Sequence, residues 1–316
     1  MERRRAIRNL IFGVAASFLP DALYGRQRED DQQDYVVHSE VRLVLLDVSV
    51  KDRDGGFVGG LSKSNFEIFE NGVLQPITVF ANSDVPVTIG ILVDESRSMT
   101  PKRTEVLVAA EIFIAESNPK DEIFVLNFND TVKRGLPGDV AFTDNIEQLR
   151  AALNRGVPEG RTALNDAIVE GLKQLELGRR DKKSLIMVSD GGDNASRHTR
   201  RDMLDTVERS IATIYTIGLF DAGDPDQDTG ILKQLARMSG GEAYFPADPA
   251  SMATVCRGIA KSIRTRYTIG YVPAARNGAG ALRRIRVRVS AAGRARLTAR
   301  TRTRYRYEET GNQSSK

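Results

Sequence analysis

The middle of the chain alternates between short apolar runs and longer stretches in which apolar residues recur every three or four positions. The run Val87–Val93 is apolar at almost every position, which is typical of a strand covered by helices on both faces. Residues 103–117 instead show helical spacing. Strands that alternate with helices in this way predict an α/β domain over residues 85–264, with a doubly wound, mainly parallel sheet flanked by helices. Further strands are expected at 122–128, 140–142, 184–188, 213–219 and 242–245, and further helices at 146–154, 163–177, 201–210, 230–238 and 249–263.

Both flanks of this domain have the alternating pattern of half-buried strands. Residues 40–84 contain the dipeptide Asn71-Gly72, a hairpin signal because both residues tolerate positive φ. Residues 265–307 include strand patterns at 267–272, 284–289 and 297–307. Neither flank alone has enough strands to be stable, and the ends of an inserted domain usually lie close together. We therefore expect the N-terminal and C-terminal β segments to pair into one small β-sandwich.

The N-terminus has the pattern of a secretory signal. Arg3, Arg4 and Arg5 precede an apolar run over residues 10–19, which is shorter than the roughly 20 residues that span a bilayer. Residues 1–25 therefore predict a signal peptide or an N-terminal anchor, and with it a periplasmic, cell-surface or secreted protein. The alternative is a basic tail with a chance apolar patch. Residues 26–39 resemble a polar linker, and residues 308–316 a disordered tail.

The distribution of charge along the chain indicates which classes of partner to expect. The net charge of the chain is +4, but arginines concentrate between residues 283 and 306. Their alternation with apolar residues predicts a strand with a solvated basic face, which could contact anionic envelope lipid or polysaccharide. No aromatic stacking platform shares that face, so we expect no nucleic-acid partner.

The single cysteine, Cys256, excludes an intramolecular disulfide and fits an apolar helical pattern, so we expect it to be a core residue.

Hydroxyl and carboxylate residues occur in three loops of the predicted α/β domain. The sequence Asp94-Glu95-Ser96-Arg97-Ser98 ends the first central strand, Thr162 precedes a helix, and Asp190 follows another apolar strand. In open α/β sheets, ligands bind at the carboxyl ends of the strands, so these loops are expected to meet. Oxygen ligands of this kind suit Mg²⁺. The alternative is that Ser96 and Ser98 cap a helix and that Asp190 and Asp193 stabilise a turn.

The three loops resemble the metal-ion-dependent adhesion site of von Willebrand factor A domains. That site has the same order: D-x-S-x-S, then a threonine, then Asp-Gly after an apolar strand. Motifs at 61–72, 84–87 and 267–273 are similar to von Willebrand factor A-related proteins of Acidobacteria, so that the likeness extends over residues 40–307. The adhesion-site pattern is the more specific part.

The resemblance implies a site and a function. It implies that Asp94, Ser96, Ser98, Thr162 and Asp190 hold Mg²⁺, with Mn²⁺ or Ca²⁺ as substitutes, and that a carboxylate of a protein partner fills an open position. The chain is then an exported binding or adhesion module and not an enzyme. Many members have glycine where this chain has Arg97, whose charge could disfavour the metal or attract an acidic ligand. Glu95 is variable in the family, and no role is expected for it.

Two alternatives have a basis in the residues. One is a metal-independent structural or envelope-associated scaffold. The other is a serine hydrolase, which would need a histidine positioned by an acid, and the chain has only His38 and His198. No G-x-S-x-G motif is present, and a metal hydrolase would require histidines or more carboxylates around its metal. We expect Asp166 to complement the N-terminus of its helix, and the alternative is that it supports the metal ligands without binding the metal itself.

Overall fold

The computed structural model of this chain describes residues 43–220, 227–273, 281–294 and 296–306. All described residues belong to one compact unit. The predicted signal segment, the linker with His38, and the C-terminal tail lie outside the described residues. In the ranges that are described, no helix has both the length and the apolar character to cross a membrane.

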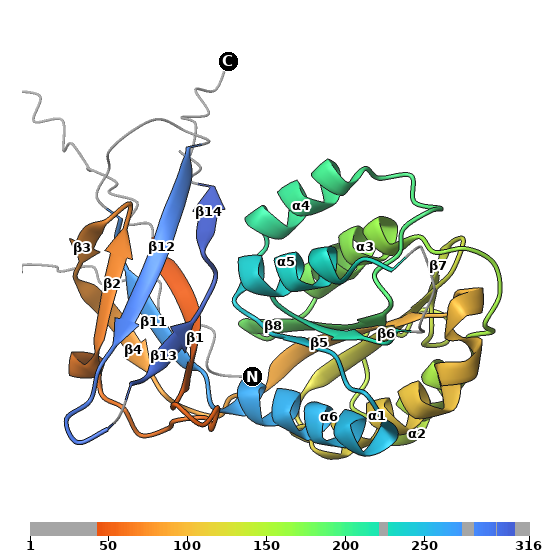
Figure 1. The fold of residues 1–316 in the computed structure, drawn as a ribbon, viewed down its shortest axis with the longest axis horizontal. Coiled ribbons are helices and arrows are strands. Elements are labelled where there is room, and N and C mark those ends of the chain that lie inside the picture. Colours follow the sequence, from red (N-terminus) through yellow and green to blue (C-terminus); the bar gives the residue numbers. More distant parts are fainter. Residues whose placement is uncertain (1–42, 221–226, 274–280, 295, 307–316) are drawn as a thin grey trace, which may run out of the picture. The chain divides into compact units, whose positions relative to one another are not determined.

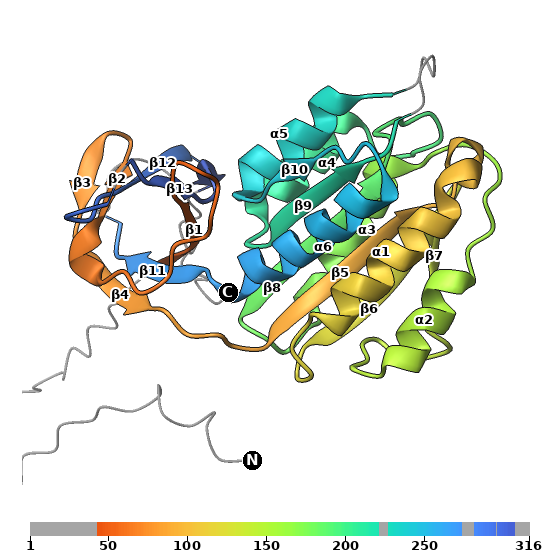
Figure 2. The same cartoon turned by 60° about the horizontal axis from the view of Figure 1, so that its bottom comes forward.

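The central sheet of the described residues has the strand order β10-β9-β8-β5-β6-β7 (Figures 1 and 2). All its neighbouring strands are parallel except β7, which runs antiparallel to β6. The strands are β5 (Val87–Asp94), β6 (Glu122–Phe128), β7 (Val132–Arg134), β8 (Lys182–Ser189), β9 (Thr213–Gly218) and β10 (Ala243–Tyr244). This is the doubly wound, mainly parallel sheet that the sequence predicts.

Helices cover both faces of this sheet. Helices α1, α2 and α6 pack on one face, and α3, α4 and α5 pack on the other (Figures 1 and 2). Every residue of β5 is buried, which explains its unbroken apolar run. The helices are α1 (Arg103–Ala115), α2 (Ile146–Asn154), α3 (Leu164–Glu176), α4 (Arg200–Arg209), α5 (Thr229–Ser239) and α6 (Pro249–Arg264).

The direction of winding reverses at β5. The chain leaves β5 to form β6 on one side, and later returns to place β8 on the other side. In the register of these strands Val93 pairs with Val188 and Asp94 pairs with Phe128. Ligands of open α/β sheets bind in the crevice at such a reversal point. The ends of β5 and β8, which carry Asp94 and lead into Asp190, therefore lie side by side at this crevice.

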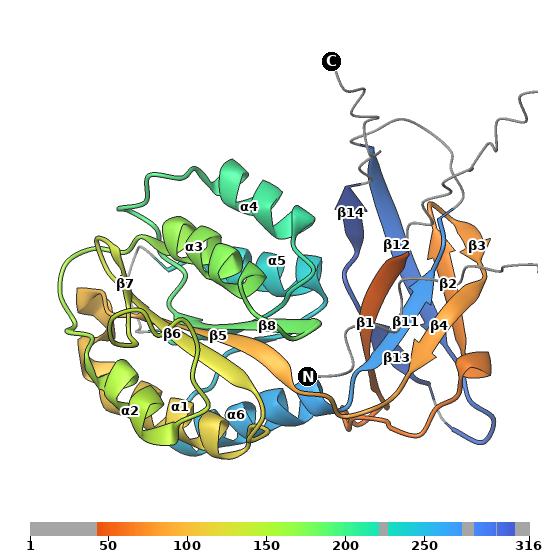
Figure 3. The same ribbon diagram turned by 180° about the vertical axis from the view of Figure 1, so that it is seen from behind.

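The flanking segments pair with each other, as the sequence predicts (Figure 3). In the described residues, one antiparallel sheet has the order β13-β1-β11-β4 and another has the order β14-β12-β2-β3, and both contribute to one hydrophobic core. Strand β1 pairs with β11 and β13, while β2 pairs with β12. The strands are β1 (Val44–Lys51), β2 (Phe66–Glu70), β3 (Val73–Gln75), β4 (Ile77–Ala81), β11 (Tyr267–Tyr271), β12 (Leu282–Val289), β13 (Thr298–Arg300) and β14 (Arg304–Arg306). The hairpin between β2 and β3 turns at Asn71 and Gly72, with φ of 49° and 84°.

Two predicted strands differ from the structure. Residues 140–142 form no strand, and only an isolated bridge joins Ile123 to Thr143. The edge strand is instead β7, which the pattern did not indicate because its three residues include Lys133 and Arg134. The predicted strand 297–307 is divided in two, because β13 pairs with β1 whereas β14 pairs with β12.

The two antiparallel sheets together are called the flanking β unit below. A cluster of buried charged and tyrosine side chains lies in this unit. The carboxylate of Glu70 accepts a hydrogen bond from Arg283 Nη1 at 2.6 Å on Oε1. On Oε2 it accepts hydrogen bonds from the hydroxyls of Tyr271 and Tyr305, both at 2.7 Å. Glu70 and Arg283 are 6% and 2% exposed. The cluster joins strands from the N-terminal and C-terminal flanks, so it stabilises the pairing of two segments that are distant in sequence.

Candidate metal-binding site

The first loop of the site begins where β5 ends. Asp94 is the last residue of that strand, and Ser96 precedes a short 3-10 helix, η2 (Arg97–Lys102), that leads into α1. The backbone N–H of Ser96 donates to Asp94 Oδ1 at 2.9 Å, and the hydroxyls of Ser96 and Ser98 are 3.1 Å apart. Ser96 occupies the N-cap position of η2, but its side chain makes no capping hydrogen bond. The helix-capping alternative therefore does not hold for Ser96.

The loop after β8 makes direct hydrogen bonds with the first loop. Ser98 Oγ donates to Asp190 Oδ2 at 2.6 Å, and Ser189 Oγ donates to Asp94 Oδ2 at 2.6 Å. Asp190 Oδ1 also accepts from the backbone N–H of Gly192 at 3.1 Å, so the residue stabilises its turn as well. Asp94 and Asp190 are both 2% exposed. The carboxylates of two adjacent strand ends are thus linked through serine hydroxyls.

The loop that carries Thr162 is held against both other loops by backbone contacts. Arg97 N donates to Gly160 O at 3.3 Å, which fixes it to the first loop. Thr162 N donates to Asn194 Oδ1 at 2.9 Å, and Thr162 O accepts from Asn194 N at 2.9 Å. Thr162 is 5% exposed, and among the described residues its hydroxyl makes no hydrogen bond with the other candidate ligands. The structure therefore joins Asp94, Ser96, Ser98 and Asp190 by direct contacts and brings the Thr162 loop to them.

Burial dominates the electrostatics of the first carboxylate. It raises the pKa of Asp94 to about 7, against the opposing effect of hydrogen bonds from Ser189 and Ser96, and the charge of Asp190 raises it further. Two buried carboxylates with three nearby hydroxyl residues are a donor set that fits a hard divalent cation, whose charge would balance theirs. No group of three or more Asp, Glu, His or Cys residues that could hold a metal occurs in the described ranges. Any cation here would thus depend on hydroxyl oxygens as well as on carboxylates.

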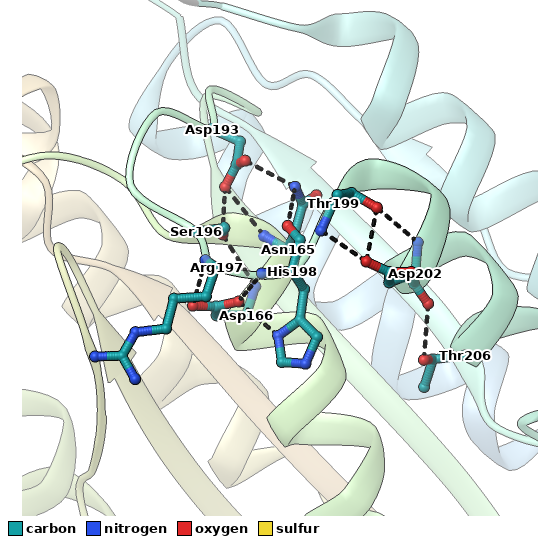
Figure 4. A network of polar contacts seen from close by, with 9 residues as sticks. All are labelled: Asn165, Asp166, Asp193, Ser196, Arg197, His198, Thr199, Asp202 and Thr206. Carbon is teal, nitrogen blue, oxygen red and sulfur yellow. Dashed lines mark hydrogen bonds and ion pairs between the residues drawn. The ribbon is translucent and has the colours of Figure 1, made fainter.

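A network of polar contacts fixes the loop between β8 and α4 to the start of α3 (Figure 4). Asp193 Oδ2 accepts from Asn165 Nδ2 at 2.7 Å, and Asp193 Oδ1 accepts from Ser196 Oγ at 2.5 Å. Asp166 lies in the first turn of α3, as expected, and also accepts hydrogen bonds from the backbone N–H groups of Arg197 and His198. The network supports the loop that contains Asp190, while Asp193 itself bonds to α3.

A cleft of about 450 Å³ adjoins this loop. It is lined by Gly191 and Leu164, which lie one and two residues beyond Asp190 and Thr162, and it extends to the ion pair between Arg200 and Asp228 at 3.0 Å. The cleft therefore begins next to the candidate ligands and has room for part of a bound molecule.

Two residues near the site, Ser189 and Glu95, were missed by the sequence analysis or given no role in it. Ser189 was missed, although it directly precedes Asp190 and ends a strand beside Asp94. Glu95, for which no role was expected, is 2% exposed and forms an ion pair with Arg103. Burial raises the pKa of Glu95, although the hydrogen bond and charge of Arg103 act in the opposite direction. Arg97 is exposed, and its side chain forms no ion pair with the residues that the structure describes.

Comparisons with known proteins agree with this fold. Residues 89–192 match the family of the von Willebrand factor type A domain. A search of curated proteins found no relative. Among solved structures, a von Willebrand factor type A protein from Catenulispora acidiphila superimposes with a TM-score of 0.50 at 16% identity, covering 85% of this chain and 74% of that one. This likeness supports the fold.

Two other similar structures cover a little more than half of this chain. The vWF domain of the type V pili tip protein Mfa5 from Porphyromonas gingivalis has a TM-score of 0.46 at 15% identity, with 57% of this chain and 95% of that chain covered. The conserved hypothetical protein BatB from Bacteroides thetaiotaomicron has a TM-score of 0.44 at 15% identity, with 56% and 98% covered. The narrower resemblance to proteins of Acidobacteria stays a prediction. The matched residues include most of β5, all of β8 and the candidate ligands at their ends, so this part of the chain is similar to the von Willebrand factor type A family.

Proposed function

We propose that this chain is an exported binding module that holds a divalent cation and uses it to dock a carboxylate of a protein partner. The proposed ligands are Asp94, Ser96, Ser98, Thr162 and Asp190. The observation that carries the proposal is the hydrogen bond between Ser98 and Asp190, which joins residues 92 positions apart at the reversal point of the sheet. A family resemblance in sequence order alone would not require these side chains to meet.

Each group would have a distinct part in binding. Asp94 and Asp190 supply negative charge, and the hydroxyls of Ser96, Ser98 and Thr162 supply neutral oxygen ligands. Mg²⁺ is the proposed ion because it accepts a sparse set of oxygen ligands and retains water, while Mn²⁺ or Ca²⁺ could replace it. The ion supplies the attraction for the incoming carboxylate. The neighbouring cleft and loops would then select the partner by its shape.

The proposed role is binding and not catalysis. His198 Nδ1 lies 2.7 Å from Asp166 Oδ1, but no serine or threonine hydroxyl of the described residues forms a hydrogen bond with the histidine ring. Ser196, the nearest serine in sequence, donates its hydroxyl proton to Asp193 instead. A serine hydrolase needs a nucleophile paired with its histidine, so this arrangement favours binding.

The test measures metal and partner binding on the full chain. Isothermal titration with Mn²⁺ should give saturable binding to the wild type and none to Asp94→Asn. Capture of a protein from an envelope extract should then require Mg²⁺ and should be lost with chelator or with Asp94→Asn. Asp54→Asn is the control, because Asp54 is an exposed turn residue of the flanking β unit. Mn²⁺ binding that is absent in the wild type, or unchanged in Asp94→Asn, would refute the proposal.

A second candidate function rests on the basic face of β12. Arg284, Arg286 and Arg288 are exposed there, while Ile285 between them is 7% exposed. This face favours contact with anionic lipid or polysaccharide of the cell envelope. Sedimentation with phosphatidylglycerol vesicles should decrease with salt and in Arg286→Ala. Equal sedimentation with phosphatidylcholine vesicles would argue against this role.

A further inference from the structure

The side chain of Glu95 lies between two candidate metal ligands in sequence, yet it is withdrawn from solvent. Its side chain is 3% exposed, and Oε2 accepts a hydrogen bond from Arg103 Nη1. The other oxygen, Oε1, is buried and has no hydrogen-bond partner among the described residues. A carboxylate in this setting is costly, because its desolvation is compensated only in part by a single cation. A structural role of Glu95 in this loop would explain why its carboxylate is buried despite the unfavourable desolvation.

Glu95 is held by two backbone hydrogen bonds and by the ion pair of its side chain. Glu95 N donates to Phe128 O at 2.7 Å, and Glu95 O accepts from Glu159 N at 2.9 Å. Arg103, its ion-pair partner, also donates from Nη2 to Asn154 O at 3.4 Å. These contacts connect the first candidate metal loop to the end of β6, to α1, and to the end of α2 with the segment that follows it.

The residue opposite Oε1 is a glycine. A Cβ atom added at Gly156 would lie 2.0 Å from Glu95 Oε1, so any side chain there would displace the carboxylate. Gly156 precedes Glu159 and Gly160, whose backbones contact the first loop. The close approach of Glu95 to Gly156 therefore sets how near the segment leading to Thr162 comes to Asp94 and Ser96.

We propose that Glu95 is a positioning residue for the metal site, and that its ion pair with Arg103 fixes the two candidate ligands beside it relative to the Thr162 loop. This inference rests on the proposed function, because it assumes a cation at those ligands. Glu95 itself faces Arg103 and Gly156, so it acts on the site through the backbone of Asp94 and Ser96. Replacing a residue that orients metal ligands without binding the metal itself commonly weakens metal affinity by about 10- to 100-fold.

The test compares Mn²⁺ affinity with stability on the metal-free full chain. Glu95→Gln keeps the shape of the side chain and removes its charge, and we expect its dissociation constant for Mn²⁺ to rise about 10-fold or more. Arg103→Gln should have a similar effect, and the double variant should be little worse than either single one. Glu70→Gln is the matched control, because it breaks a buried carboxylate–arginine pair in the flanking β unit. We expect it to lower stability in chelator while Mn²⁺ affinity stays within about twofold.

A second pair of variants applies if Glu95→Gln does not fold. Gly156→Ala leaves the Glu95 charge intact but forces its carboxylate to move, whereas Gly258→Ala in α6 meets no atom within 4 Å. Gly156→Ala should weaken Mn²⁺ binding and speed hydrogen exchange of residues 94–103 in chelator, and Gly258→Ala should do neither. If Mn²⁺ affinity were unchanged in Glu95→Gln and Gly156→Ala, or were reduced as much by Glu70→Gln, the inference would be wrong. The proposed function would then still stand. No Mn²⁺ binding by the wild type would overturn the proposed function, and the inference with it.

Discussion

Ser98 Oγ donates a hydrogen bond to Asp190 Oδ2 across 2.6 Å and thereby connects the loop after β5 to the loop after β8. Ser189 makes the reciprocal contact, donating to Asp94 Oδ2 at 2.6 Å. Each strand end therefore supplies one carboxylate and one hydroxyl to the other. These contacts partly satisfy two buried acids, and a divalent cation would compensate their charge more fully.

A cation that binds the folded chain should stabilise it against unfolding. By mass action, ligand at 100 times its dissociation constant adds about 2.7 kcal/mol to the free energy of unfolding. We therefore expect Mg²⁺ or Mn²⁺ to raise the melting temperature of the wild type relative to chelator, and Asp190→Asn to abolish the rise. Differential scanning calorimetry measures both. Asp54→Asn should respond like the wild type, and an equal rise in Asp190→Asn would show that the ions bind elsewhere.

The Glu70 cluster should be a major source of stability in the flanking β unit. Tyr271→Phe removes one of the hydrogen bonds to a buried carboxylate, which should lower the free energy of unfolding by about 1.5–3 kcal/mol. Urea denaturation gives the value. Tyr244→Phe is the matched control, since Tyr244 donates to Glu242 at 2.6 Å in a partly exposed position and should lose less. Equal losses in the two variants would contradict a special role for the buried cluster.

Stability should depend on pH through Asp166. Burial alone would raise the pKa of Asp166, but the N–H groups of Arg197 and His198 and the His198 ring together hold it below the ordinary value. The folded chain then binds this proton less readily than the unfolded chain does. The stabilisation is complete above the unfolded pKa of about 4 and is lost as the pH falls through the lower folded pKa.

Asp166→Asn should accordingly be less stable than the wild type at pH 7, with a difference that shrinks below about pH 4. Urea denaturation across this range provides the measurement. A difference that stays constant from neutral to acidic pH would mean that the charge of Asp166 contributes nothing.

Cys256 should be unreactive while the chain is folded. The residue is 2% exposed, in agreement with the core position that the sequence predicts, and burial raises the pKa of its thiol to about 12. A rise of this size from an ordinary thiol lowers the thiolate fraction at pH 8 roughly a thousandfold. Reaction with Ellman's reagent should be slow in buffer and complete in urea. Fast reaction of the native chain would place Cys256 at the surface.

Local patterns were sufficient to predict most of the α/β domain. The unbroken apolar run of β5 and the helical spacing in α1 report burial directly, so these elements agree with the structure to within two residues at their ends. The meeting of Asp94 with Asp190 was also predictable, because parallel strands end at one edge of the sheet. The short polar strand β7 carries no such pattern and was missed.

Residues whose importance comes from distant partners could not be predicted in the same way. Arg283 is one arginine in an arginine-rich stretch, and its burial follows only from its pairing with Glu70, 213 positions away. Glu95 appeared to be a variable position within a motif, since nothing in the local sequence indicates that Arg103 and Gly156 enclose it. Ser189 could have been recognised, because the residue before Asp190 ends a strand that neighbours β5.

The pairing of β1 with β11 and β13 has a consequence for how the chain is made. Ribosomes synthesise β1 before the α/β domain, and β11 and β13 after it. Strand β1, which ends at Lys51, therefore lacks these two partners until the chain has reached Tyr267 and Thr298. The α/β domain, in contrast, can fold once its own sequence is complete. We infer an order of assembly in which the inner domain forms first and brings the two ends of the chain together, so that closure of the outer β unit is the final step.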